Sequence, residues 1–259
     1  MKDYLTRKYS GDENRYFVSR MIEYSKRCER TQQRIFTDFL DPIKVKIAWE
    51  ISKTCDGISM GLYGGFEEAE RRMAVILPEW DSIEPKEYPI EMLKMTDKGW
   101  GGALSHRDYL GALLGIGIKR EKIGDLVVGE GFCLAAIHRD IAGFVETNME
   151  RAGRNSVTVE KVDANALELK PEFREMRITV TSPRLDGVIG PVFGLSRAKS
   201  AKLIAAGKVK VNWEVCTRTD TALQEGDIVS AGGKGKFKVR EIAGVTKKGR
   251  TIVVTDKYI

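Results

Sequence analysis

The stretch from residue 182 to residue 210 restricts the fold most strongly, because its pattern predicts two short helices followed by a strand. Ser182 can cap a helix through its hydroxyl, and Pro183 suits the first helical position, where its missing N–H has no partner in any case. The apolar residues that follow at helical spacing are Leu185, Val188 and Ile189. Glycine and proline then interrupt the pattern, and Gly207 ends a second helix. A compact helix–helix–strand unit is therefore expected.

Basic residues occupy one face of the second helix and one side of the strands. At about 100° per residue, Lys199 and Lys202 lie opposite the face that carries small and apolar residues. Lys208 and Lys210 alternate with valines, and Lys and Arg alternate with apolar residues again within residues 233–240. Alternating side chains leave a strand on opposite faces. The pattern predicts a positive surface built on an ordinary apolar core.

The excess of positive charge lies entirely in the last third of the chain. Residues 183–259 contain 15 Lys and Arg against 7 Asp and Glu, a net charge of +8, whereas the first 182 residues contain 28 against 30. A single Lys-rich run is most often a solvated face. A small module with this charge suits a polyanion, because each neutralised phosphate releases condensed counterions. A membrane surface is disfavoured, because no basic amphipathic helix has a broad apolar face. Nucleic acid is the predicted partner.

This segment resembles the αL RNA-binding module named after ribosomal protein S-four, over residues 183–240. The matching residues, in order and spacing, are Arg184, Leu185, Asp186, Ser196, Arg197, Ile204, Gly207, Val209, Val211, Asn212, Gly226, Asp227, Ile228, Gly233 and Phe237. Trp213 departs from the family, which usually has Gly after the Val-Asn pair, so we expect a longer or differently shaped turn. The resemblance implies binding of structured RNA, with Arg184, Arg197 and Lys199 facing the phosphates.

The candidate RNA-binding residues form one predicted cationic surface. They are Arg184, Arg197, Lys199, Lys202, Lys208, Lys210, Lys234, Lys236 and Lys238. We interpret the first six as the main phosphate surface and the last three as its extension. The hypothesis is that this one surface grips folded RNA.

Residues 1–56 predict an N-terminal helical segment. Residues 17–28 follow helical spacing, residues 31–40 start a second helical pattern, and a third helix is expected from Pro42 to Lys53. Basic residues are dense here, but glutamates interleave with them. Two interpretations stay open, a solvated helical face or a secondary contact with RNA or protein.

Residues 57–170 alternate strands and helices, which predicts a central α+β sandwich with helices on one side of a sheet. The predicted strands are Ile58–Tyr63, Met73–Leu77, Tyr88–Thr96, Asp125–Val128, Phe132–Ile137 and Ser156–Val162, and the predicted helices are Glu67–Arg72, Ser105–Leu114 and Asp140–Arg151. Ser105 and Asp108 form a capping-box pair. A strand over Met176–Thr181 leads into the C-terminal domain, residues 182–259. The expected fold class is α+β.

The sequence contains no pattern typical of a metal site, a cofactor site or a catalytic centre. The cysteines are far apart, without a C-x-x-C pair, and we interpret them as reduced structural thiols: Cys28, Cys55, Cys133 and Cys216. No apolar run is long enough to span a bilayer, and the N-terminus lacks the apolar core of a signal peptide. We expect a cytoplasmic, monomeric protein that does not contact a membrane.

A second resemblance covers nearly the whole chain. The glycine-rich run Gly99–Leu126, followed by Leu169–Asp186 and the basic module, is similar to the bacterial YlmH family. This resemblance implies an N-terminal helical segment, a central RNA-recognition-like domain and the C-terminal αL module. It also implies a non-catalytic factor that binds the large ribosomal subunit, its ribosomal RNA and peptidyl-tRNA, in quality control of stalled nascent chains.

Two other functions stay open from the sequence. The first is an RNA-modifying enzyme, a pseudouridine synthase or methyltransferase, because αL modules are often attached to such enzymes. It requires a catalytic Asp or a cofactor turn in a suitable context, which we do not find. The second is a protein-interaction scaffold in which the central domain matters more than RNA.

Overall fold

The computed structural model describes residue 9 and residues 11–99, 101–163, 173–246 and 249–258. The chain divides into two compact units, Met1–Leu169 and Lys170–Ile259, and each is described by itself. Both combine helices with antiparallel sheets, so the predicted α+β class is confirmed. Within the described ranges, no helix has the length and apolar character needed to cross a membrane.

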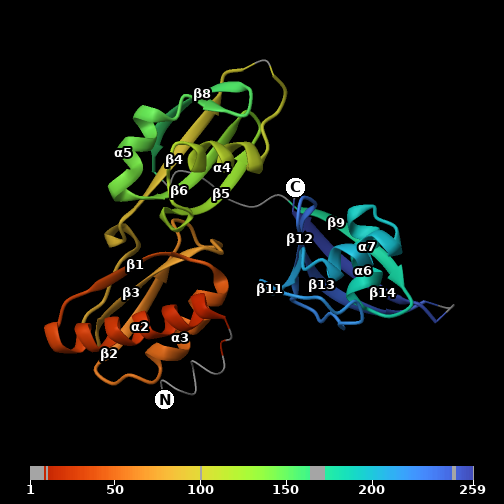
Figure 1. Ribbon diagram of the computed structural model, residues 1–259, viewed down its shortest axis with the longest axis horizontal. Helices are drawn as coiled ribbons and strands as arrows, with labels where there is room; N and C mark the ends of the chain where they lie inside the picture. Colours follow the sequence, from red (N-terminus) through yellow and green to blue (C-terminus); the bar gives the residue numbers. More distant parts are fainter. Residues whose placement is uncertain (1–8, 10, 100, 164–172, 247–248, 259) are drawn as a thin grey trace. The chain divides into compact units, whose positions relative to one another are not determined.

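The first unit begins with a three-stranded antiparallel sheet covered on one face by two helices (Figure 1). Its elements are α2 (Asp12–Thr31), β1 (Ile35–Leu40), α3 (Pro42–Ser52), β2 (Ile58–Tyr63) and β3 (Arg72–Pro78), in the sheet order β1-β3-β2. The helix predicted from Pro42 is confirmed. Asp41 caps it, because its carboxylate accepts a hydrogen bond of 2.9 Å from the Lys44 N–H.

The helix predicted over residues 31–40 is wrong. Gln32 takes a left-handed backbone with a φ of 53°, and its N–H donates to the Cys28 carbonyl, which ends α2. Residues 35–40 instead pair with β3 as a strand, and a register shift between Phe36 and Phe39 places Ile35 in the core under α2 and α3 and Phe39 on the opposite face. β2 and β3 pair in the same sheet as β1. They therefore belong with the N-terminal segment, although the boundary predicted at residue 57 placed them in the central domain.

The short helix predicted over Glu67–Arg72 is also absent from the described residues. The backbone N–H groups of Glu70 and Arg71 donate to the Asp125 carboxylate, at 2.5 and 3.2 Å. Arg72 already belongs to β3. A long-range acceptor therefore holds these N–H groups in a turn, where a local pattern suggested a helix.

The central part of the first unit is a five-stranded antiparallel sheet with two helices packed on one face. Its elements are η1 (Pro85–Glu87), β4 (Ile90–Asp97), α4 (His106–Gly115), η2 (Arg120–Lys122), β5 (Ile123–Gly129), β6 (Phe132–His138), α5 (Arg139–Asn148), β7 (Arg151–Ala152) and β8 (Asn155–Val162), in the sheet order β5-β6-β4-β8-β7. The chain order β4-α4-β5-β6-α5-β8 is that of an RNA-recognition fold. The predicted capping box is present, since the Ser105 N–H donates to the Asp108 carboxylate at 2.9 Å.

The two sheets of the first unit pack on each other through the faces that their helices leave open. β3 is buried on both sides, because Ala74 and Ile76 join the core under α2 and α3 while Met73 and Val75 point the other way. Those residues meet a cluster from the central sheet that comprises Met92, Leu134 and Ala136. The N-terminal sheet therefore covers part of the central sheet's second face.

The second unit is a six-stranded antiparallel sheet with two short helices on one face. Its elements are β9 (Phe173–Val180), α6 (Leu185–Phe193), α7 (Arg197–Ala205), β10 (Val209–Val211), β11 (Glu214–Val215), β12 (Ile228–Ala231), β13 (Gly235–Val245) and β14 (Thr251–Tyr258), in the sheet order β11-β10-β12-β13-β14-β9. Gly190 lets α6 lie close to the loop that leads into α7, because a Cβ there would lie 3.0 Å from the Leu195 carbonyl oxygen. β9 pairs with β14 along its whole length. The boundary predicted at residue 182 is therefore too late in the chain.

The turn between β10 and β11 keeps two residues despite Trp213. Asn212 and Trp213 both have positive φ, 48° and 67°, and Val211 pairs with Glu214 directly across the turn. Asn212 fixes the turn, because its amide donates to Asp227 and accepts from the Ile228 N–H. The longer turn expected from the sequence is therefore not formed, and Trp213 adopts a conformation that is rare for a bulky residue.

Leu134→Ala tests the packing between the two sheets of the first unit. Leu134 is 2% exposed, so the substitution leaves a cavity and should lower the free energy of unfolding by about 2–5 kcal/mol. The matched control is Leu114→Ala on α4, where the leucine is 41% exposed and the loss should stay below about 1 kcal/mol. Urea unfolding followed by circular dichroism measures both, and equal losses would contradict this packing.

Candidate nucleic-acid interface

The two helices of the second unit begin at different kinds of cap. Ser196 caps α7, and its hydroxyl accepts a hydrogen bond of 3.3 Å from the Lys199 N–H. α6 begins at Leu185, two residues later than the predicted start at Pro183. Before it, the Leu223 N–H donates to the Pro183 carbonyl at 2.8 Å. This long-range pairing keeps Pro183 out of the helix and makes Arg184 the cap residue.

Asp186, in the first turn of α6, holds two of the predicted RNA-binding residues. Its side chain is 7% exposed. Arg184 Nε lies 3.1 Å from Asp186 Oδ1, and Arg197 donates to Oδ2 through Nε at 3.1 Å and Nη2 at 3.0 Å. The two arginine side chains remain 40% and 74% exposed. One buried carboxylate therefore orients two solvent-facing guanidinium groups and leaves the trio with a net charge of +1.

The carboxylate of Asp186 is stabilised in its charged form. Burial alone raises its pKa, but the hydrogen bonds from Arg197 and Arg184 outweigh burial and hold this pKa below its usual value. Removing both arginines would leave a buried carboxylate without cationic partners, which is costly. Asp186 and the arginines therefore depend on each other.

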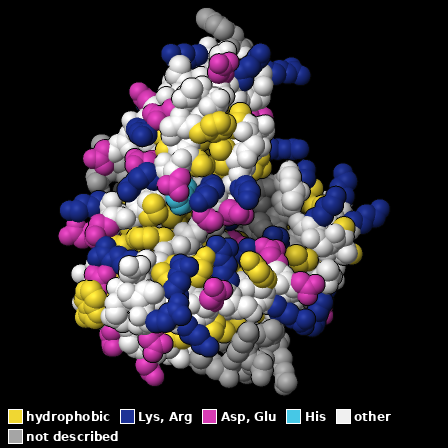
Figure 2. All heavy atoms as spheres, turned by 60° about the vertical axis from the view of Figure 1, so that its left-hand side comes forward, with side chains coloured by type: hydrophobic (Ala, Val, Ile, Leu, Met, Phe, Trp, Pro, Cys, Tyr) yellow, Lys and Arg dark blue, Asp and Glu magenta, His cyan; other side chains and the backbone are white. Residues whose placement is uncertain are grey.

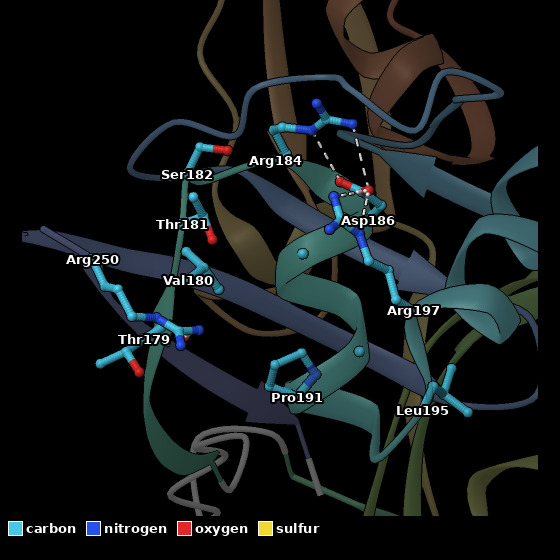
Figure 3. Close-up of a pocket in the computed structure, with 12 residues that line it drawn as sticks. Thr179, Val180, Thr181, Ser182, Arg184, Asp186, Pro191, Leu195, Arg197 and Arg250 are labelled. Atoms are coloured by element: carbon cyan, nitrogen blue, oxygen red, sulfur yellow. Dashed lines mark hydrogen bonds and ion pairs between the residues drawn. The ribbon is translucent and has the colours of Figure 1, made fainter. Parts of the chain in front are cut away.

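A pocket of about 200 Å³ lies beside this cluster. Arg184, Arg197 and Arg250 line it, together with hydroxyl groups from the end of β9 and the backbone of α6 (Figure 3). Arg250 precedes β14, and its Nη2 donates to the Thr179 carbonyl at 2.9 Å. The cationic lining comes from three separate segments of the chain. Planar guanidinium groups of this kind match the geometry of phosphate oxygens.

The structure divides the predicted RNA-binding residues between two faces of the sheet. Arg184 and Arg197 lie on the helical side, and Lys199 and Lys202 are exposed on α7. Lys210, in contrast, lies on the strand face opposite the buried Val209, and the same alternation places two more lysines on that outer face: Lys236 and Lys238. The single continuous surface expected from the sequence is therefore split by the sheet itself.

The other predicted lysines lie at the edge between these faces. Lys208 precedes β10 and Lys234 lies in the turn between β12 and β13, and both are exposed. The Lys208 carbonyl accepts a hydrogen bond of 2.8 Å from the Gly232 N–H, which joins the two segments. Arg250 was not among the predicted site residues. The sequence shows that the turn before β14 is basic, but it does not show where the side chain of Arg250 points.

The basic residues of α2 do not form a comparable cluster. Arg20 and Arg27 both stack on the ring of Tyr24, at 5.2 Å from its centroid. Arg34, beyond the helix, binds Asp81 and Glu87. Figure 2 shows Lys and Arg side chains interspersed with Asp and Glu over the visible face. The contacts of Arg20, Arg27 and Arg34 within the first unit favour a solvated face, and a secondary contact with RNA or protein stays the other interpretation.

Asp186→Asn tests the role of the buried carboxylate. At neutral pH we expect a loss of about 1–3 kcal/mol in the free energy of unfolding, because Asn cannot balance the two guanidinium charges. The folded-state pKa of Asp186 is lowered, so its contribution is complete above about pH 5 and is lost as the pH falls through that pKa. Urea unfolding of both proteins should show a difference that is constant above about pH 5 and shrinks below about pH 4. A difference that does not change with pH would contradict this role.

Three protein-family models match successive parts of the chain. The one described as "YlmH, N-terminal" covers residues 13–79, the one described as "Putative RNA-binding domain in YlmH" covers residues 84–166, and the S4 domain covers residues 192–229. The first two ranges correspond to the two sheets of the first unit. The third contains α7, β10 and β11 and ends within β12.

Two similar proteins match larger parts of the chain than any one of these family models. A Bacillus subtilis (strain 168) protein named "Ribosome-associated protein quality control protein P2" is 32% identical over 246 residues, which is 95% of each chain. A solved structure, "Cell division protein ylmH from Streptococcus pneumoniae", shares the fold over 62% of this chain and 98% of its own, with a TM-score of 0.55 and 20% identity. With successive domain matches and a full-length relative at this identity, the chain belongs to the YlmH family.

Proposed function

We propose that this protein is a non-catalytic RNA-binding factor of the ribosome. It binds the large subunit through ribosomal RNA and peptidyl-tRNA, and acts in quality control of stalled nascent chains in the cytoplasm. The matching RNA-binding and S4 domain models support the RNA-binding part of this proposal, and the name of the Bacillus subtilis relative supports the ribosomal part. The protein acts as a monomer.

The observation that carries the proposal is the convergence of Arg184, Arg197 and Arg250 on one pocket. Asp186 holds two of these guanidinium groups in place before any ligand binds. A preorganised cation loses less side-chain entropy when it meets a phosphate than a mobile one does. The excess charge of the C-terminal third adds a long-range attraction toward RNA.

The pocket beside Asp186 is small for a cofactor site. Its volume of about 200 Å³ is below the roughly 300–1,000 Å³ that is typical of small-molecule and cofactor sites. It can receive a phosphate with part of its ribose more readily than a nucleoside cofactor. Transfer of a methyl group from S-adenosylmethionine to ribosomal RNA, or isomerisation of a uridine, would contradict the non-catalytic assignment.

Arg197→Ala/Lys199→Ala should weaken binding to large ribosomal subunits by a few kcal/mol, because two exposed cations that face phosphates are lost. The fold should remain intact, since Arg184 still pairs with Asp186. Co-sedimentation over a salt series measures the effect, and the slope of log K against log salt concentration should become shallower by about 1–2.

The matched control removes the same charge from the first unit. Lys46→Ala/Lys119→Ala replaces two exposed lysines, and its binding should equal that of the unchanged protein. Equal affinity of all three proteins for large subunits would reject the helical-side arginines as the contact surface.

Fragments of the second unit separate RNA binding from a scaffold role of the first unit. A fragment of residues 170–259 retains β9 and the whole sheet, so it should fold and keep most of the ribosome affinity. A fragment of residues 183–259 lacks β9 and exposes the edge of β14, so it should be unstable or aggregate. Circular dichroism and co-sedimentation measure both. A folded 170–259 fragment without ribosome affinity would favour a composite site that includes the first unit.

A further inference from the structure

The outer face of the six-stranded sheet carries a row of side chains that crosses every strand. Lys210 pairs with Val215 on one side and Ser230 on the other, and Ser230 pairs with Lys236. Phe237 pairs with Lys257 in the antiparallel strands β13 and β14, so the preceding residue of β13, Lys236, lies opposite the following residue of β14, Tyr258. Tyr258 pairs with Phe173 on β9. We call these six residues the outer row: Val215, Lys210, Ser230, Lys236, Tyr258 and Phe173.

The outer row lies on the face that α6 and α7 do not cover. Its neighbours along the strands, among them Val209, Val229 and Phe237, point the other way into the core beneath the helices. Successive side chains of a strand lie on opposite faces. The outer row is therefore separated from the arginine pocket by the thickness of the sheet.

Two aromatic rings and an ammonium group form the centre of this row. The rings of Phe173 and Tyr258 meet edge to face, with centroids 4.8 Å apart. Lys236 Nζ lies 4.2 Å from the centroid of Tyr258. Phe173 is 44% exposed. Aromatic rings displayed on an open sheet face beside cations are the arrangement by which several RNA-binding folds hold unstacked bases.

The charge around the row is also suited to RNA. Lys210 and Lys236 belong to it, and Lys208 and Lys234 lie beside its strands. Its six residues include no carboxylate side chain. In the adjacent row Asp256 and Glu175 both bind Arg240, which offsets one of their two negative charges, and Lys238 pairs with Asp256 across the strands.

We propose that the outer row binds an unpaired segment of RNA, with bases stacked on Tyr258 and Phe173 and phosphates beside Lys210 and Lys236. This inference rests on the proposed RNA-binding function and deepens it, because it adds a second surface with a different preference. Bases within a duplex have their faces covered by neighbouring bases, so only an unpaired strand can use the rings. The arginine pocket presents guanidinium and hydroxyl donors, which suit a phosphate in any RNA.

The experiment compares the full-length protein with Phe173→Leu/Tyr258→Leu, using two labelled probes. One is an unpaired 12-nucleotide RNA, long enough for about one to three single-strand binding sites. The other is a blunt RNA hairpin closed by a non-nucleotide linker, so that it contains no unpaired base. Leucine keeps apolar bulk and removes the π face, so affinity for the unpaired probe should fall about tenfold or more. Affinity for the hairpin should be unchanged.

The matched control is Tyr16→Leu/Phe144→Leu, which removes the same two ring types from exposed positions of the first unit. This control should bind both probes as the unchanged protein does. Circular dichroism and thermal unfolding verify that each variant is folded.

A salt series separates stacking from charge. Phe173→Leu/Tyr258→Leu should lower the affinity for the unpaired probe without changing the slope of log K against log salt concentration. Lys210→Ala/Lys236→Ala should make that slope shallower by about 1.4, because a single strand contributes about 0.7 for each neutralised phosphate.

Ultraviolet cross-linking of the unchanged protein to the unpaired probe gives a test that needs no variant. Peptides that contain Phe173 or Tyr258 should carry the cross-linked nucleotide when analysed by mass spectrometry. Cross-links confined to other peptides would overturn the proposal, even if the aromatic variant fails to fold.

Other outcomes also decide the question. Unchanged affinity of Phe173→Leu/Tyr258→Leu for the unpaired probe would reject stacking by the outer row. Equal losses of affinity for both probes would reject it too. Neither result bears on the arginine pocket. Phe173→Leu/Tyr258→Leu could also bind both RNA probes normally but bind large subunits more weakly. That result would assign the outer row to a protein partner and would also reject the proposal. Loss of hairpin binding in Arg197→Ala/Lys199→Ala is the separate test of the proposed function.

Discussion

The burial of β-sheet faces is the constraint on which the rest of this structure depends. Helices bury one face of each sheet, and whatever covers the second face decides which surface stays exposed to a ligand. In the first unit both sheets use helices on one face and each other on the second. In the second unit α6 and α7 cover one face, and the other carries polar and aromatic side chains. The same layer rule thus gives a largely closed first unit and an open sheet in the second.

This constraint changes what the central domain can do. RNA-recognition folds hold bases on the sheet face that their helices leave free. Here Met92, Leu134 and Ala136 on that face pack against Phe39, Met73 and other residues of the N-terminal sheet. The corresponding surface of the central domain is therefore partly occupied within the chain itself. The central domain therefore shares the strand order of RNA-recognition folds without having their sheet surface fully exposed for binding.

Asp186 shows how a buried charge can serve binding. Burying the carboxylate has a cost in free energy, which the hydrogen bonds from the two arginines offset. What it provides is orientation, because Arg184 and Arg197 come from different helices and would otherwise sample many rotamers. Asp186 and the two arginines together carry a net charge of +1, and they line a pocket that Arg250 also lines. The stability of this region and the proposed contact with phosphate therefore depend on the same three side chains.

Local pattern was sufficient for elements whose signals lie within a few residues. Pro42 predicted the start of α3, Ser105 with Asp108 predicted the capping box of α4, and alternating Lys and Val predicted β10. The charge of the C-terminal third and its motif spacing likewise predicted the basic module. Each of these features depends on backbone caps, side-chain period or composition, which neighbouring residues determine.

Tertiary structure decided everything that depends on residues far apart in the chain. Ile35–Leu40 became a strand because β3 pairs with it. The segment before β3 formed a turn because Asp125 accepts the N–H groups of Glu70 and Arg71, and Pro183 stayed outside α6 because its carbonyl accepts from the Leu223 N–H. The position of Arg250 and the meeting of Phe173 with Tyr258 are also long-range results. The sequence by itself determined which side chains are cationic and which strands alternate. Only the packed sheet decided on which side each cation lies, because a strand's two faces become different only when helices cover one of them.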